Sequence, residues 1–259
     1  MMQYLKSNTI VQQLVLTASL IGTIYGYYTY GTTYSTVLLP ILGYFLYAGL
    51  GISVTFHRYL THKSYKTHPW LIKIGTILGT LSNTGSSIGW VAVHMNHHKF
   101  ADKQSDPHSP KHKGLKMFAL EYGIKNYIDI VKWKMKHLIG SSFHMFLHKY
   151  YFAVIASWSL SLYLIGGLDL MIFLHWFPMI ISGVMSNIVN YIGHKPTWWG
   201  GYRRYNTNDN SVNNWLWAIP SWGETLHNNH HKHPYSAIHG EKWYEIDIGG
   251  YIVKLITIK

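Results

Sequence analysis

The chain has 259 residues, of which 48% are apolar and 16% aromatic, and its formal net charge is +12. It contains no cysteine, which excludes disulfides, thiolate ligands and iron–sulfur clusters held by this chain. The apolar residues are gathered in long runs, a pattern typical of a membrane protein rather than a soluble domain.

Two apolar runs open the chain, Ile10–Tyr30 and Thr36–Phe56, and each is long enough to cross a bilayer, which takes roughly 20 residues. The tight link Gly31-Thr32-Thr33 joins them, so the pair is predicted to form a helical hairpin. The preceding Met1–Asn8 has one lysine and no small-residue cleavage site, so we expect the first run to be retained rather than removed as a signal peptide.

Two histidines follow the second run, His57 and His62. Neutral imidazole is a common metal ligand. Five positions on an ideal α-helix separate two side chains by about 140°. The spacing therefore predicts that the span ends here and the chain turns, so that each ring reaches a metal from a different side.

The next apolar run, Trp70–Val93, is interrupted by Lys73 and by the polar stretch Ser82–Ser87. If it crossed the membrane, His57 and His94 would lie on opposite sides and could not share a metal centre. We therefore predict interfacial or re-entrant helices here, not a fifth span.

A second histidine group comes directly after this run. His94, His97 and His98 lie three and four positions apart, so they are expected to share one helix face. Trp90, one turn before His94, is a candidate wall of a substrate tunnel, with a membrane-interface anchor as the alternative. Asp106 is a candidate carboxylate for orienting an imidazole, with an ordinary loop carboxylate as the alternative.

Two further apolar runs, Tyr151–Gly167 and Leu170–Ile192, meet at Gly166-Gly167 and predict a second hairpin. All 22 lysines and arginines lie outside the links of the two hairpins. By the positive-inside rule, both termini and a cap formed by 57–150 and 193–259 are expected to face the cytoplasm. This topology accounts for the basic excess and argues against nucleic-acid binding.

The end of the fourth run carries Asn190 and His194, an i,i+4 pair. His175 lies in the same run about 22 Å from Asn190 along the helix, too far to share a centre. We expect it to be an ordinary buried histidine. The other histidines outside the groups are expected to be surface or satisfied core residues: His68, His108, His112, His137, His144, His148, His233 and His239.

The last group is His227-Asn-Asn-His230-His231, again spaced to share a helix face. Nine grouped imidazoles are enough to hold two metal ions. The chain has ten carboxylates and one Glu-x-x-His, at Glu224, which argues against a carboxylate-bridged di-iron bundle. Structural zinc would take four ligands, usually with cysteine. The all-nitrogen set suits two redox-active irons, with Glu224 and Asp209 as further candidates for orienting imidazoles.

The motifs together resemble those of the integral-membrane fatty acid desaturases, most closely the Δ9 acyl branch, from about Gly49 to Pro234. They are His57-Arg-Tyr-Leu-Thr-His62, His94-Met-Asn-His97-His98-Lys-Phe-Ala-Asp with Ser105-Asp-Pro-His-Ser-Pro110, and Gly223-Glu-Thr-Leu-His-Asn-Asn-His-His-Lys-His-Pro234. Asn190-x-x-x-His194 matches the Δ9 branch specifically. Leu226 departs from the family, many members of which have tryptophan there, and the chain is short.

The resemblance implies an all-α integral-membrane fold in which four transmembrane helices carry a cytoplasmic cap with a di-iron centre. It implies an enzyme that uses two Fe²⁺ ions, O₂ and two electrons to place a cis double bond in a saturated acyl chain. Asn190 would reach one iron through water. The implied histidine ligands are His57, His62, His94, His97, His98, His194, His227, His230 and His231.

The resemblance also bears on partners. Neither His68-Pro69-Trp70 nor His233-Pro234-Tyr235 is followed by the Gly-Gly of a haem-binding loop, so no haem is expected in this chain. Electrons would come from a separate donor of the cytochrome b5 or ferredoxin type. The substrate would be carried on CoA, acyl carrier protein or a lipid. The cap lysines Lys111, Lys113, Lys116, Lys132, Lys134 and Lys136 suit any of these, or the bilayer surface.

In relatives the tunnel floor comes from the second span, which corresponds here to Ile41, Tyr44 and Phe45. The sequence hypothesis is that Phe45 stops the acyl chain early, and the alternative is that these rings face lipid. Two rival functions remain open: a hydroxylase or other oxygenase on the same scaffold, and a non-catalytic membrane metal-binding or transport protein. The scarcity of charges within the spans argues against transport.

Overall fold

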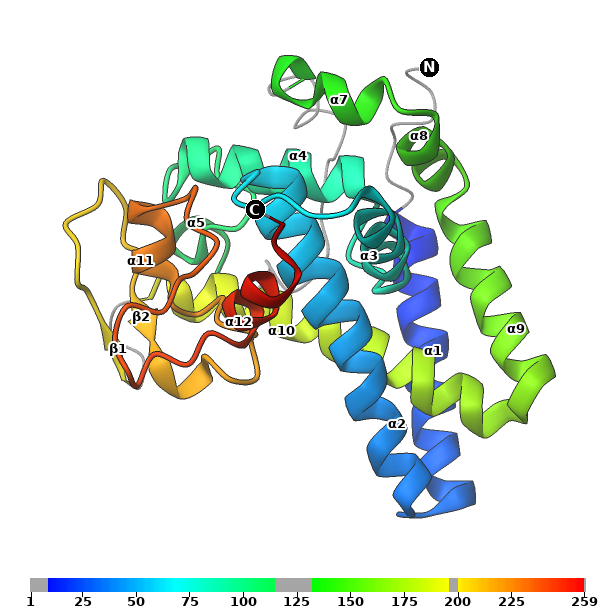
Figure 1. Ribbon diagram of the computed structural model, residues 1–259. Coiled ribbons are helices and arrows are strands. Elements are labelled where there is room, and N and C mark those ends of the chain that lie inside the picture. Colours follow the sequence, from blue (N-terminus) through cyan, green and yellow to red (C-terminus); the bar gives the residue numbers. More distant parts are fainter. Residues whose placement is uncertain (1–8, 115–131, 196–199, 259) are drawn as a thin grey trace.

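The computed structural model describes residues 9–114, 132–195 and 200–258, and helices dominate it (Figure 1). Two short strands, β1 (Gly201–Tyr202) and β2 (Asn213–Asn214), pair antiparallel with Gly201 opposite Asn214. The helices are α1 (Thr9–Tyr30), α2 (Tyr34–Tyr44), η2 (Phe45–Thr61), α3 (Pro69–Leu81), α4 (Ser87–Phe100), α5 (Pro110–Lys113), η4 (Lys132–Met135), α7 (Lys136–Ile139), α8 (Ser142–Lys149), α9 (Tyr151–Met171), η5 (Ile172–Trp176), α10 (Phe177–Gly193), η6 (Trp215–Trp217), α11 (His227–Lys232) and α12 (Ile248–Ile256).

Three helical segments in the described residues are long and apolar enough to cross a membrane: Ile10–Tyr30, Tyr34–Thr61 and Tyr151–Gly193. They contain all four predicted apolar runs. Large apolar side chains on α1 face outward, with Leu14 and Ile24 each 63% exposed. Such exposure is favourable in lipid and costly in water, so the chain is a membrane protein.

The link between α1 and α2 is a helix cap. Gly31 has a φ of 63°, and Thr33 and Thr36 satisfy each other's backbone N–H groups through their hydroxyls. From this link α1 and α2 diverge as a V, and η5 packs against both of them (Figure 1). The first predicted pair is therefore an open hairpin with a third element between its arms.

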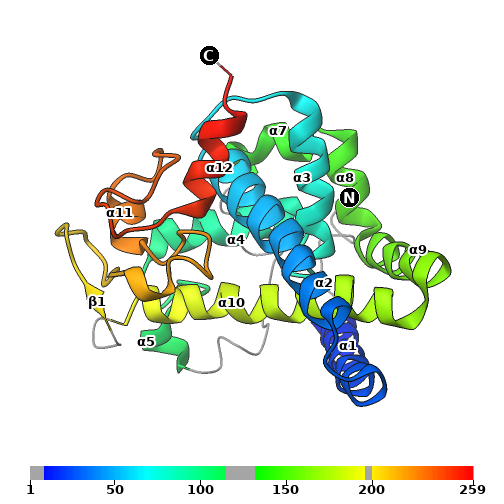
Figure 2. The same cartoon turned by 60° about the horizontal axis from the view of Figure 1, so that its bottom comes forward.

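The third long segment breaks at the predicted link, where Gly166 and Gly167 leave helical geometry and Gly167 adopts a φ of 77°. Only glycine adopts that backbone conformation readily. Beyond the break the chain turns sharply, so α9 and α10 lie at a wide angle rather than side by side (Figures 1 and 2). The second pair therefore differs from the predicted hairpin of adjacent arms.

The interrupted run Trp70–Val93 forms two helices, not one. α3 ends at Leu81, and a turn follows in which Asn83 and Gly85 have φ values of 56° and 119°. Ser86 then caps α4 by accepting a hydrogen bond from the N–H of Gly89 at 3.2 Å. In agreement with the sequence interpretation, this run does not form a single crossing helix.

α4 and α12 gather around one end of η2, and α10 also contacts η2 (Figure 1). α3 packs so closely on η2 that a Cβ on Gly51 would lie 2.4 Å from the backbone nitrogen of Gly79. The buried core beside this contact includes Phe56, Ile88 and Met135. This packing fixes η2, which carries the first histidine group, against α4, which carries the second.

Candidate metal centre

The first histidine group lies in a widened helix turn. In η2 the backbone hydrogen bonds reach five residues back, as in His62 N–H to His57 O at 3.1 Å. This π-type geometry places residues five apart on one face, and the two rings have centroids 4.8 Å apart. The span ends at this group, as predicted, with His62 directly after the last residue of η2. The predicted approach of the two rings from different sides is wrong, because the helix widens and brings them together.

The second and last groups each divide between two clusters. On α4, His94 and His98 join one cluster and His97 joins the other. On α11, His230 joins the cluster of His94 and His98, while His227 and His231 join the cluster of His97. The prediction that the rings of each group all point the same way is therefore too simple. A single turn of each helix lies between the two clusters and contributes rings to both.

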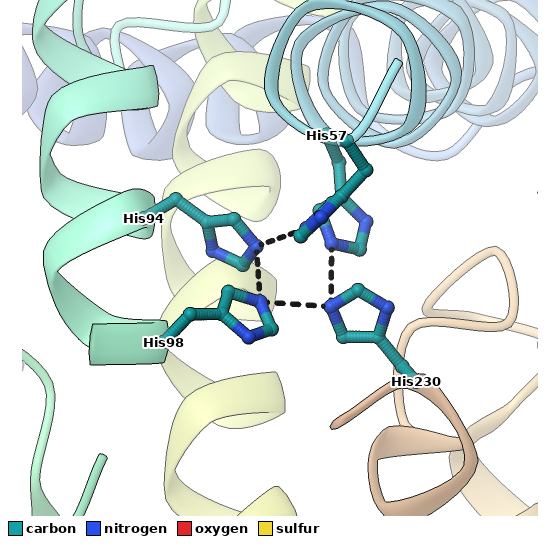
Figure 3. A group of neighbouring side chains, drawn as sticks. His57, His94, His98 and His230 are labelled. Carbon is teal, nitrogen blue, oxygen red and sulfur yellow. Dashed lines mark hydrogen bonds between the residues drawn. The ribbon is translucent and has the colours of Figure 1, made fainter. Parts of the chain in front are cut away.

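The five-histidine cluster draws its rings from η2, α4 and α11, and Figure 3 shows four of them pointing toward one another. Neighbouring Nε2 atoms lie 2.9 to 3.1 Å apart. Two ligands at right angles on a metal, each at about 2.1 Å, are about 3.0 Å apart. The cluster consists of His57, His62, His94, His98 and His230.

The four-histidine cluster lies directly beside the first. The His97–His194 and His194–His227 Nε2 pairs are each 3.1 Å apart. The ring centroids of His98 and His231, one from each cluster, are 4.6 Å apart. All nine predicted histidines thus meet in two adjacent clusters, the second consisting of His97, His194, His227 and His231.

Hydrogen-bond chemistry shows that a cation fits here. The Nδ1 atoms of His97 and His194 face Asp106 and Asp102 at 3.0 Å, and a carboxylate only accepts, so both Nδ1 atoms donate. When both rings are neutral, their Nε2 lone pairs point at each other across 3.1 Å. The Nε2 of His231 is buried without a hydrogen-bond partner. A metal ion between the rings satisfies all of these atoms at once.

Burial keeps most of the rings neutral, the form that binds metal. Burial, followed by the neighbouring His231, lowers the pKa of His62 to about 3. Burial likewise lowers the pKa of His231 to about 4, against the opposing effect of Asp209. At His97 burial also acts to lower the pKa, but Asp106 raises it overall. This ring therefore lies in a field that favours positive charge, which a bound metal would supply.

The structure places the three carboxylates singled out from the sequence against histidine rings. Asp106 and Asp209 accept from His97 and His231 at 3.0 and 2.7 Å. Glu224 lies 2.5 Å from His57 Nδ1. Asp102, which sequence reasoning missed, does the same for His194. Its position in the segment trailing the second histidine group was the available signal.

A third set of ligand-type side chains, His57, Glu224 and His239, surrounds the guanidinium of Arg58. The guanidinium of Arg58 already supplies the positive charge there. Its Nη2 lies 3.2 Å from Glu224 Oε1 and 3.2 Å from His239 Nδ1, and it donates to Asp247 at 2.8 Å. Sequence reasoning missed Arg58, Asp247 and His239, because their partners are far away in the chain.

An apolar pocket of about 90 Å³ leads away from the clusters, lined by η2, α4, α10 and the loop before α11. Asn190 lines it, and its side-chain amide donates to Ser186 O at 3.0 Å. Trp90 lines it too, stacked on His94 with centroids 4.9 Å apart. Tyr44 lies about three turns before His57 and lines the pocket beside Trp222.

Two of the residues expected to line the tunnel are placed elsewhere. Ile41 is 61% exposed, and Phe45 packs on Trp222 without lining the pocket. His175, expected to be an ordinary buried histidine, lies far from the clusters and contacts Ser159 Oγ at 2.9 Å and Leu81 O at 3.2 Å. It is a satisfied core residue, as predicted.

Two adjacent histidine clusters beside an apolar pocket in a membrane protein are suited to metal-dependent chemistry on an apolar substrate. The chain belongs to the fatty acid desaturase family, which residues 32–246 match. It is therefore an oxidoreductase, and its histidine clusters are compatible with an iron centre. The family resemblance carried by the histidine groups is confirmed.

Individual relatives agree. The chain is 32% identical over 241 residues to an sn-1 stearoyl-lipid 9-desaturase of Anabaena variabilis, covering 92% of this chain and 86% of the relative. It is 33% identical over 236 residues to Delta-9 acyl-lipid desaturase 2 of Arabidopsis thaliana, covering 90% and 74%. It is also 34% identical over 210 residues to an acyl-CoA C20 Delta5-desaturase of Anemone leveillei, covering 80% and 66%.

Proposed function

We propose that this protein is an oxygen-dependent acyl desaturase that places a cis double bond at the Δ9 position of a saturated acyl chain. The observation that carries the proposal is the meeting of nine histidines in two adjacent clusters beside an apolar pocket. Two relatives whose printed names specify position 9 favour that regiochemistry.

The two clusters would hold two iron ions, with Asn190 reaching the four-histidine position through water. When bound, the irons would activate O₂, the oxidant that removes two hydrogens from an unactivated methylene pair, which no side-chain acid or base can do. The protein's own residues bind and orient the chain. Trp90 walls the pocket against His94, and the apolar lining keeps water from the reacting carbons.

The far end of the pocket would set the acyl length. Tyr44 lines the pocket about three turns before His57 and is held by a hydrogen bond from its hydroxyl to Pro220 O at 2.5 Å, with its ring 5.5 Å from that of Trp222. These contacts hold the Tyr44 ring in the pocket wall. We therefore assign the stop to Tyr44 with Trp222, in place of the Phe45 favoured by the sequence.

The proposed topology has four spans, 10–30, 36–56, 151–167 and 170–192, in a multi-pass integral membrane protein. The termini and the cap (57–150 and 193–259) would lie in the cytoplasm, because the lysines and arginines avoid the links between spans. Electrons would come from a separate cytochrome b5 or ferredoxin type donor. Among the carriers, lipid is favoured over CoA and acyl carrier protein by the names of two relatives.

Expression in a desaturase-deficient host, followed by fatty acid profiling with double-bond location, tests the proposal. Cells producing the wild-type chain should gain Δ9 unsaturated acyl chains only in the presence of oxygen. His97→Ala should abolish the product because it removes a ring of the four-histidine cluster. A hydroxylated lipid without a double bond would instead identify an oxygenase, and no modified lipid would contradict an enzyme of this kind.

A further inference from the structure

The two histidine clusters differ in the charges behind them. Three of the four rings in the four-histidine cluster donate from Nδ1 to an aspartate, and the fourth, His227, contacts the backbone carbonyl of Glu224 at 3.2 Å. The pairs are His97–Asp106 at 3.0 Å, His194–Asp102 at 3.0 Å and His231–Asp209 at 2.7 Å.

Asp106 is buried, Asp102 and Asp209 are partly buried, and none of the three carboxylates has a described lysine or arginine partner. In the described part of the chain, none lies within 4.0 Å of a lysine or arginine nitrogen. Their other contacts are neutral donors, such as the N–H of His108 to Asp106 and the N–H of Ser211 to Asp209. One carboxylate oxygen of Asp102 is buried with no hydrogen-bond partner at all. This cluster therefore has three formal negative charges that no described lysine or arginine pairs with. Arg203 contacts Asp209 only at its backbone carbonyl, at 2.8 Å.

The five-histidine cluster has one carboxylate, Glu224, behind His57. That carboxylate is shared with the hydroxyl of Ser53 and with Arg58, whose guanidinium is 3.2 Å away and also binds Asp247. Arg58 offsets one of these two negative charges, leaving one. Across residues 9–114, 132–195 and 200–258, no carboxylate oxygen lies within 4.0 Å of a ring nitrogen of the other four histidines.

A carboxylate behind a ligating histidine makes the ring a stronger donor, and removing one such partner typically costs about 10–100-fold in metal affinity. Buried negative charge attracts a cation directly, because the low local dielectric screens it little. The fifth imidazole of the other cluster adds to the metal affinity of that cluster, but it is a neutral ligand and brings no charge. The charge difference therefore favours the four-histidine position.

We propose that the two metal positions differ in affinity, an inference that rests on the proposed metal centre. The four-histidine position, supported by Asp102, Asp106 and Asp209 as positioning residues, retains its metal ion when the five-histidine position loses its own. The centre thus has one tightly held ion and one exchangeable ion.

The test uses detergent-purified full-length protein loaded with ⁵⁷Fe and exposed to a chelator. Iron per chain and Mössbauer spectra are followed over time, so no activity measurement is needed. The iron content should fall in two steps, and one quadrupole doublet should outlast the other. That surviving doublet should be the one altered by Asp209→Asn, whose amide oxygen still accepts from His231 but lacks the charge.

Glu224→Gln is the matched control, since it neutralises the carboxylate of the other cluster. It should alter the doublet that disappears first. Asp102→Asn serves as a second variant if Asp209→Asn does not yield monodisperse protein. The inference is overturned if the doublet altered by Glu224→Gln is the one that survives, or if both irons are lost together. In either case the proposed function is still tested separately, by the lipid products. Wild-type protein that holds no iron overturns both.

Discussion

Arg58 connects the histidine clusters to the packing of the C-terminal helix. It follows His57 directly, is 1% exposed, and donates to Asp247, which is also 1% exposed and caps α12. A buried guanidinium of this kind is stable only because its partners supply the opposite charge. The contact ties the C-terminal helix to the first histidine group.

Arg58→Met should destabilise the protein, on the order of 3–5 kcal/mol, because it leaves the buried Asp247 carboxylate without its cation. Thermal unfolding of the detergent-purified protein measures the effect as a lower Tm. Adding Asp247→Asn should recover part of the loss, since the uncompensated charge is removed. An unchanged Tm in the single variant would show that the ion pair contributes nothing net.

Tyr44 and Phe45 are neighbours with different surroundings, which makes them a matched pair. Tyr44→Ala should lengthen the pocket and shift the products toward longer acyl chains, because only Tyr44 lines it. Phe45→Ala should leave the profile nearer to wild type. Lipid profiling of the two variants in the same host decides between them. A shift with Phe45→Ala alone would restore the sequence-based hypothesis.

At the scale of elements, the widened helix η2 is the main departure from sequence expectation. An ideal α-helix places His57 and His62 on different faces, whereas hydrogen bonds that reach five residues back place them on one. Such a helix is less stable by itself than an α-helix and needs support from the packing around it. The close contact with α3 at Gly51 and Gly79 supplies that support.

Gly51→Ala should lower the Tm, because its Cβ would lie 2.4 Å from the backbone nitrogen of Gly79, and overpacking of this kind typically costs about 1–3 kcal/mol. The strain should also reduce iron retention, since η2 carries His57 and is followed directly by His62, two members of the five-histidine cluster. Gly183→Ala is the control for stability: no atom lies within 4 Å of its added Cβ. Equal Tm values for the two variants would contradict the packing argument.

At the scale of the whole molecule, the links between the long apolar helices are separated from the two histidine clusters. The links at 31–33 and 166–167 lie away from the clusters, while α4, α11 and the end of α10 converge on them (Figures 1 and 2). The proposed topology places the links on one side of the membrane and the metal centre on the other.

The absence of cysteine makes this topology directly testable with single cysteines. Thr32→Cys and Ile165→Cys, at exposed positions near the two links, should react with a membrane-impermeant thiol reagent in intact cells. Ser105→Cys, exposed in the cap, should react only after the membrane is opened. Labelling of all three in intact cells would contradict the proposed orientation.

The sequence by itself determined the properties that are local. Run length and apolarity predicted the membrane segments, and the break at Gly166-Gly167 lies where the composition placed it. The histidine groups predicted the family because ligand type and spacing are read along a single helix turn. They did not predict the widening of η2, since that depends on packing against α3.

Only the tertiary structure decided how the groups combine. The division of nine rings into five and four, the aspartate behind His194 from a segment 92 residues away, and the Arg58–Asp247 pair 189 residues apart all depend on segments meeting in space. Charge balance in a buried site is set by whichever segments surround it, not by neighbours in the chain. For that reason the difference between the two clusters is visible only in the folded molecule.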